Sequence, residues 1–155
     1  MKRALDIQAV MERLAPGVLS RDGFLGTDPR PLKEILDADA STVAALHTTH
    51  AELAKKLQTV LAVAVDALGK TAEIGDRLRA VYAEGIGRIA CPWGSCGTFR
   101  KGEVTLTDAS TGHRMVFSEL GVHLIAKHGF YQGHASRYRL EPADIHRIFR
   151  LRGAE

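Results

Sequence analysis

Two cysteines and two histidines are the residues of this sequence whose types and spacing are best suited to chemistry. The segment Cys91-Pro-Trp-Gly-Ser-Cys96 holds both cysteines of the 155-residue chain, and 26 residues separate it from the segment His123-Leu-Ile-Ala-Lys-His128. A structural zinc ion is usually bound by four thiolate sulfurs and imidazole nitrogens in a tetrahedron. The sequence therefore predicts one zinc site, whose expected ligands, called the Cys/His cluster below, are Cys91, Cys96, His123 and His128.

The two residues of each pair can bind one ion only if the chain around them adopts a particular local structure. Proline and glycine between the two cysteines favour a tight turn, which can bring both sulfurs to one point. His123 and His128 are five residues apart on an expected helix, and that spacing corresponds to about 140° around the helix axis. Both imidazoles can reach one ion only if the helix loosens near His128. Gly129 supplies a reason for this, because glycine readily ends a helix in a left-handed conformation.

The Cys/His cluster resembles the two-Cys, two-His zinc finger, in which a β-hairpin precedes a helix. Besides the two pairs, Phe99 after the second cysteine and Leu120 on the helix match that finger. The resemblance implies that the four residues are zinc ligands and that Leu120, with Phe99 or Phe117, forms a small core. The gap of 26 residues between the pairs exceeds the spacing of about 12 in the finger. The order of knuckle, hairpin and helix over residues 91–128 also resembles a treble-clef zinc site.

Other interpretations of the same residues stay open. His113 or His134 could replace one of the four ligands, or the cysteines could be buried thiols that fill a core without a metal. A Cys-dependent enzyme would instead use Cys91 or Cys96 as a nucleophile, which requires a cation or a helix N-terminus nearby to lower the thiol pKa. The alternatives to a zinc protein are therefore a metal-free interaction protein and an enzyme.

Residues 1–70 are expected to form a helical region. Apolar residues recur with a period near 3.6 over residues 2–15, and a second helix is expected to begin around Pro31 and to run through Leu46. Thr49 and Glu52 have the form of a capping box, so a third helix is expected over residues 53–68.

Residues 71–155 change to strand patterns. Residues 71–90 are interpreted as strand on their partial alternation. Residues 103–107 and 113–117 alternate clearly on both sides of the turn-forming segment DASTG, and they predict a β-hairpin. Ser118 is expected to cap the helix that carries the two histidines.

The last expected helix carries the densest basic cluster of the chain. It begins at Pro142, and its apolar residues are Ile145, Ile148, Phe149 and Leu151. Arg147 and Arg150 are three residues apart, so on a helix they would share a face that could contact nucleic acid or another anion. In the alternative interpretation these arginines pair with Glu141 and Asp144 on a solvated face.

Composition and charge limit the class of protein. Hydrophobic residues make up 45% and charged residues 25% of the chain, as in ordinary globular domains. No apolar run approaches the ~20 residues that span a bilayer, and the first residues lack the apolar core of a signal peptide. Residues 86–155 carry 10 Lys+Arg against 6 Asp+Glu, an excess weaker than the dense basic clusters of nucleic-acid-binding proteins. Two cysteines in a reducing compartment are expected to be thiols or metal ligands, and a cytoplasmic location is expected.

The sequence thus predicts an α+β protein with an N-terminal helical layer, followed by a β-hairpin and a helix in a zinc-finger-like C-terminal half. The regions 1–70 and 71–155 are expected to share one compact domain. The expected function is that of a small cytoplasmic zinc-binding protein with a structural Zn²⁺, which acts as a binding or regulatory module. A protein partner is favoured over nucleic acid, and no membrane is expected. Four protein ligands would leave no open position on the ion, which disfavours metallohydrolase chemistry.

Overall fold

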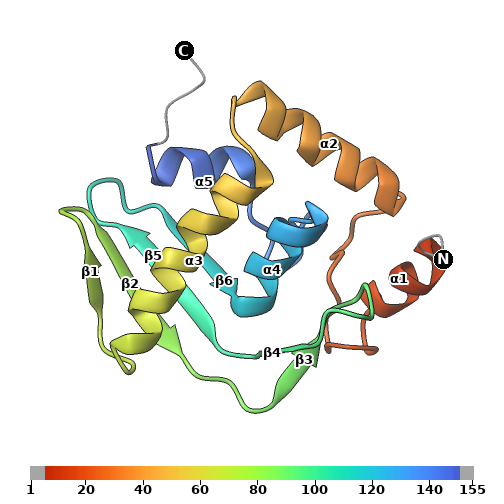
Figure 1. Ribbon diagram of the computed structural model, residues 1–155, viewed down its shortest axis with the longest axis horizontal. Helices are drawn as coiled ribbons and strands as arrows, with labels where there is room; N and C mark the ends of the chain where they lie inside the picture. Colours follow the sequence, from red (N-terminus) through yellow and green to blue (C-terminus); the bar gives the residue numbers. More distant parts are fainter. Residues whose placement is uncertain (1–5, 151–155) are drawn as a thin grey trace.

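Five helices and six strands follow one another in residues 6–150, which the computed structural model describes (Figure 1). In chain order they are α1 (Ile7–Leu14), α2 (Leu32–Ala45), α3 (His50–Asp66), β1 (Ala72–Ile74), β2 (Leu78–Ala83), β3 (Arg88–Ala90), β4 (Thr98–Arg100), β5 (Glu103–Asp108), β6 (Arg114–Ser118), α4 (Glu119–His128) and α5 (Pro142–Ile148). The predicted α+β class is confirmed. Residues 2–5 of the predicted first helix and Leu151 of the predicted last helix lie outside the described residues.

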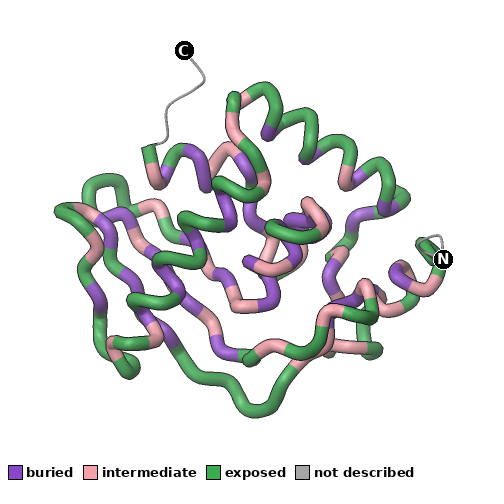
Figure 2. The backbone as a smooth tube through the Cα atoms, viewed as in Figure 1, coloured by how far each residue is buried: buried purple, intermediate pink, exposed green. Residues whose placement is uncertain are grey.

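The larger sheet has four antiparallel strands in the order β1-β2-β5-β6. The predicted hairpin is confirmed as β5 and β6, in which Glu103 pairs with Ser118 and Thr107 with Arg114. Buried and exposed residues alternate strictly along β2, so that one face of the sheet points into the protein (Figure 2). Helix α3 crosses this sheet and packs against β2 and α4 (Figure 1).

The second sheet is a hairpin of two three-residue strands, β3 and β4, in which Ile89 pairs with Phe99. It follows β2 in the chain and extends toward α1 (Figure 1). The strand interpretation of residues 71–90 is confirmed for β1, β2 and β3, but β3 pairs with β4 and not with the larger sheet. The loop between β3 and β4 is the segment that carries both cysteines.

Caps at the helix ends follow the sequence closely. The Ser118 hydroxyl accepts a hydrogen bond from the Gly121 N–H at 3.1 Å, as expected for the start of α4. The Thr49 hydroxyl accepts from the Glu52 N–H at 3.1 Å, but α3 already begins at His50. The return bond of the capping box is not made, because the Glu52 carboxylate accepts from the Thr48 hydroxyl at 2.6 Å instead. The predicted box is therefore only half correct.

Two clusters of buried apolar side chains lie on either side of α4. The sheet core joins the buried face of the larger sheet to α3, α4 and α5, and it includes Leu57, Leu106, Phe117 and Ile145. The hairpin core joins α1, α2, α4 and the β3–β4 hairpin. Its buried residues are Val10, Leu14, Phe24, Leu32, Ile35, Cys91, Leu120, Leu124 and Phe130. None of the helices within residues 6–150 combines the length and the apolar character that crossing a membrane requires.

Candidate metal centre

The four residues of the Cys/His cluster converge on one point between the β3–β4 hairpin and α4. Their ligand atoms all lie within 4.8 Å of one another. His128 Nε2 is 3.5 Å from Cys91 Sγ and 3.5 Å from Cys96 Sγ. A tetrahedral zinc ion with the usual bond lengths would place a sulfur and a nitrogen ligand about 3.6 Å apart. The cluster is therefore close enough to bind one metal ion, and its two His128-to-sulfur distances have the length that zinc requires.

The β3–β4 loop holds the two cysteines in a tight knuckle. The Gly94 N–H donates to the Cys91 carbonyl at 2.9 Å, and the Cys91 N–H donates to the Gly97 carbonyl at 3.3 Å. Gly94 and Gly97 have φ angles of +96° and +87°, a conformation that glycine adopts without the strain of a side chain. The turn predicted from proline and glycine thus forms, and it brings both sulfurs toward α4.

Helix α4 presents both imidazoles to the knuckle although they are five residues apart. His128 is the last helical residue, and Gly129 follows in the predicted left-handed conformation with φ of +60°. The Phe130 N–H then reaches back six residues to the Leu124 carbonyl at 3.1 Å, one residue further than in the common helix-ending motif. The chain therefore departs from a regular helix directly after His128. This is the place where the five-residue spacing of the two histidines predicts a loosened helix.

Aromatic rings hold the two imidazoles in place. The indole of Trp93 stacks on His128 with centroids 4.2 Å apart and an interplanar angle of 8°. The ring centroid of Phe99 lies 4.5 Å from that of His123. Phe99 and Leu120 belong to the hairpin core, as the finger resemblance implies, whereas Phe117 belongs to the sheet core.

One buried nitrogen in the cluster lacks a partner. Among the described residues, His123 Nε2 is out of contact with solvent and has no hydrogen bond. A buried polar atom without a partner costs free energy, so native proteins rarely contain one without a compensating interaction. A metal ion would supply that interaction, and the residues present therefore fit a metal.

Burial sets the protonation of the cluster. Desolvation raises the pKa of the Cys91 thiol to about 11. Desolvation, with smaller contributions from His123 and Lys127, lowers the pKa of His128 to about 4, and desolvation also lowers the pKa of His123. Both imidazoles are thus neutral at pH 7, which is the form that binds a metal. A buried thiolate at Cys91 would need a cation beside it, and a metal ion is such a cation.

Contacts from two other elements support the knuckle and the helix. The Arg13 side chain of α1 donates from Nε to the Pro92 carbonyl, inside the knuckle. The Glu119 carboxylate accepts from the Arg100 N–H at 3.2 Å and from its guanidinium at 3.1 Å, which joins the start of α4 to β4. No local pattern indicates the Arg13 contact, because 79 residues separate its two partners.

Two alternative interpretations, a substitute histidine ligand and a nucleophilic cysteine, can be compared with the structure. Within residues 6–150, neither His113 nor His134 belongs to the group of converging ligands. Cys91 is 1% exposed and its pKa is raised, the opposite of what a nucleophilic thiol needs. The geometry thus gives no support to Cys91 as a catalytic nucleophile.

Arg147 and Arg150 do not lie on one helix. Helix α5 ends at Ile148, and Arg150 follows it with a left-handed φ of +50°. Arg147 pairs with Asp144 at 3.2 Å, as the solvated alternative predicts. The Arg150 guanidinium donates to the Ser110 hydroxyl at 3.2 Å. The helical face expected from their spacing is therefore wrong, while an anion contact by either residue stays a prediction.

Comparisons with protein-family models, with curated proteins and with solved structures found no match to this chain. The functional argument therefore rests on the geometry of the Cys/His cluster and on the surfaces around it.

Proposed function

We propose that the Cys/His cluster binds one zinc ion and that this ion has a structural role. The observation that carries the proposal is the convergence of two pairs, 26 residues apart in the sequence, within 4.8 Å, with His128 Nε2 at 3.5 Å from both sulfurs. The two distances from His128 match the sulfur-to-nitrogen edge of a zinc tetrahedron. Two pairs of residues that met without binding a common ion would have no reason to lie at these distances.

The type of ligand selects the metal. Two thiolates and two imidazoles form a soft, nitrogen-containing set, which is typical of tetrahedral zinc. The oxygen ligands that calcium and magnesium prefer do not belong to the cluster. The resemblance to treble-clef and two-Cys, two-His sites supports the same metal, since a knuckle supplies one pair of ligands and a helix the other.

A structural role follows from the closed ligand set. Four protein ligands leave no position for a reactive water on the ion. The ion would join β3–β4 to α4, and through Arg13 also to α1. It would thus act as a cross-link within the hairpin core.

A structural ion leaves the biological output to the surface of the protein. We infer a small zinc-stabilised binding or regulatory module that functions in the cytoplasm, where thiol ligands stay reduced. A protein partner is preferred to nucleic acid, because Arg147 pairs with Asp144 and Arg150 lies beyond the end of α5.

The test is metal analysis of the purified full-length chain and of single variants. We expect about one zinc per chain in the wild-type protein. Cys91→Ser and His128→Ala each remove a ligand, so we expect both variants to lose most of the metal.

His134→Ala is the matched control, because His134 is an exposed histidine outside the cluster. It should retain zinc at the wild-type level. The proposal would be refuted if the reduced wild-type protein bound no added zinc. It would also be refuted if the variants of Cys91 and His128 bound zinc like the wild type.

A further inference from the structure

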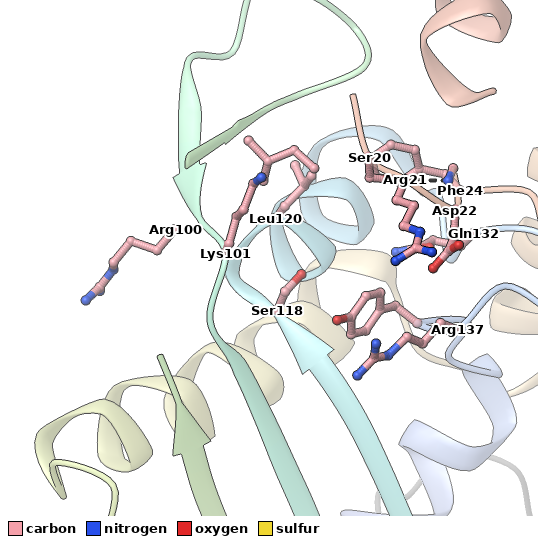
Figure 3. A pocket seen from close by; sticks show the side chains of 13 residues that line it. Ser20, Arg21, Asp22, Phe24, Arg100, Lys101, Ser118, Leu120, Gln132 and Arg137 are labelled. Carbon is pink, nitrogen blue, oxygen red and sulfur yellow. Dashed lines mark hydrogen bonds between the residues drawn. The ribbon is translucent and has the colours of Figure 1, made fainter. Parts of the chain in front are cut away.

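A pocket of about 220 Å³ lies beside the hairpin core, and Phe24, Ile89 and Leu120 of that core line it (Figure 3). Four segments that are distant in the sequence line it. They are the loop at residues 20–24, the hairpin strands β3 and β4 with Lys101, the start of α4, and the segment at residues 132–138. No residue of the Cys/His cluster lines this pocket, so the proposed zinc site does not account for it.

Basic side chains dominate the charged part of the lining. Arg21, Arg100, Lys101 and Arg137 line the pocket, against the single carboxylate of Asp22. Figure 3 shows Arg21 and Arg137 around the same space as Ser118, whereas Arg100 points away from it.

Within residues 6–150, two of these four cations, Arg21 and Lys101, are not neutralised by ion pairs, whereas Arg100 and Arg137 are. Arg100 pairs with Glu119 at 3.1 Å, and Arg137 pairs with Glu103 at 3.2 Å. In the part of the chain that the structure describes, no ion pair uses Arg21 or Lys101. Arg21 and Lys101 are therefore the unpaired cations of the lining, and they outnumber its one carboxylate, Asp22. Arg137 can add a contact that it shares with Glu103.

The remaining lining is apolar and aromatic. Phe24 and Leu120 are 4% and 3% exposed, and they belong to the hairpin core. Ile89 and the ring of Tyr138 complete this part of the lining, and the Arg137 guanidinium lies 5.2 Å from the Tyr138 ring centroid. Small-molecule sites typically combine such an apolar surface with a few converging polar groups.

We propose that this pocket binds a small organic phosphate, with its phosphate on Arg21 and Lys101 and its apolar body on Phe24, Ile89 and Leu120. Arginine and lysine are the residues that most often bind phosphate oxygens in proteins. A phosphate monoester carries up to two negative charges at neutral pH, which matches two free cations better than a single carboxylate does. The volume suits a small molecule, and the apolar surface requires a ligand with more than a phosphate group.

Calorimetric titration of the full-length, zinc-loaded protein with phenyl phosphate tests the proposal. We expect one site per chain. Replacing both free cations, in Arg21→Gln/Lys101→Gln, should weaken binding by roughly tenfold or more, because two charge-assisted contacts are lost. Both side chains are exposed, so the double variant should fold normally, which circular dichroism checks.

Three comparisons give the result its meaning. Lys55→Gln/Lys56→Gln removes the same charge from the exposed side of α3 and should bind like the wild type. Inorganic phosphate should bind at least tenfold more weakly than phenyl phosphate, since it cannot contact the apolar lining. Phenol, which lacks the charge, should not bind detectably.

Several outcomes would overturn the proposal. Phenyl phosphate that fails to bind at about millimolar concentration would do so, as would equal affinity in the wild type and in Arg21→Gln/Lys101→Gln. Equal binding of inorganic and phenyl phosphate would show that the apolar lining has no role. A single-stranded oligonucleotide that binds through Arg21 and Lys101, where phenyl phosphate does not, would assign the surface to nucleic acid instead. Each of these results leaves the zinc proposal intact, because the metal content is measured separately.

Discussion

At the scale of single residues, the neighbours of the ligands matter as much as the ligands themselves. Trp93 and Phe99 pack on His128 and His123, so the two imidazoles are oriented by contacts that exist independently of a metal. Gly129 lets α4 end directly after His128. A site built in this way is largely pre-organised, which lowers the entropy cost of binding an ion.

Gly129→Ala is expected to destabilise the protein for two separate reasons. Its φ of +60° disfavours any side chain, and an added Cβ would lie 2.8 Å from His50 Nε2. His50 has little freedom to move, because its Nδ1 lies 2.7 Å from the Tyr131 hydroxyl. We expect a loss of about 2 kcal/mol in the free energy of unfolding, measured with urea.

Gly112→Ala separates the two reasons. Gly112 also has a positive φ, of +77°, but an added Cβ there meets nothing within 4 Å. This variant should lose only about 1 kcal/mol, which is the strain alone. If both variants lose the same amount, the approach of His50 to Gly129 has no energetic effect.

Arg13→Ala is expected to make the metal easier to remove. The Arg13 guanidinium donates to the Pro92 carbonyl between the two cysteines, so its loss leaves the knuckle free to open. Residues that support metal ligands typically change metal affinity by about 10-fold or more. We expect zinc transfer to a coloured chelator to be roughly tenfold faster than in the wild type.

Arg79→Ala is the control for this measurement, because Arg79 is exposed and only weakly paired with Glu73 at 3.8 Å. It should transfer zinc at the wild-type rate. A wild-type rate in Arg13→Ala as well would mean that α1 does not support the site.

At the scale of the elements, the β3–β4 hairpin is the part that most needs the metal. Its strands are three residues long, and within residues 6–150 they pair only with each other. An isolated two-stranded hairpin is marginally stable in water. The proposed ion would join this hairpin to α4, in addition to the Arg100–Glu119 pair.

Hydrogen exchange should reveal this dependence. Chelation of the metal is expected to reduce the protection of the backbone amides in residues 88–100 and near the end of α4. The amides of β2 and β5 should keep their protection, because both strands lie inside the four-stranded sheet. Equal loss of protection in both sheets, or none in the hairpin, would contradict a local structural role.

The sequence could predict the elements whose signals are local. Ser118 and Gly129 mark the ends of α4 through contacts with residues a few positions away, and the structure confirms both predicted ends. The alternation of β5 and β6 was likewise sufficient to find their hairpin. The sequence indicates the four cluster residues because they form two close pairs of zinc-binding residue types, although the gap between the pairs is longer than in the finger.

The remaining features depend on long-range contacts or on very short elements. Strand β4 has three residues, too few for alternation to be recognised. The Arg13 contact and the pocket lined by Arg21, Lys101 and Arg137 join segments that are far apart in the chain. The predicted Arg147–Arg150 face failed because α5 ends at Ile148, and no glycine or proline marks that end.

At the scale of the whole molecule, the two cores divide the work of holding the fold. The sheet core contains the four-stranded sheet, α3 and α5, and none of its residues belongs to the Cys/His cluster. The hairpin core includes Cys91 and packs around the cluster. Loss of the metal should therefore weaken one part of the protein and leave the other part folded.

Removal of the metal should lower the thermal midpoint without abolishing the fold. At free zinc about 1,000 times the dissociation constant, binding would stabilise the protein by about 4 kcal/mol, which corresponds to a shift of roughly 10 °C at this chain length. The far-ultraviolet circular dichroism at 20 °C should keep its α+β form after chelation, since the sheet core needs no ion. Complete unfolding on chelation, as in a minimal zinc finger, would show that the sheet core is not independent.

X-ray absorption at the zinc edge of the loaded protein tests the central claim most directly. The geometry predicts two sulfur ligands at about 2.3 Å and two nitrogen ligands at about 2.0 to 2.1 Å, with no further ligand. His123→Ala should replace one nitrogen by a water oxygen or lose the metal. A first shell with fewer than two sulfurs, or with oxygen ligands in the wild-type protein, would contradict a closed site made by Cys91, Cys96, His123 and His128.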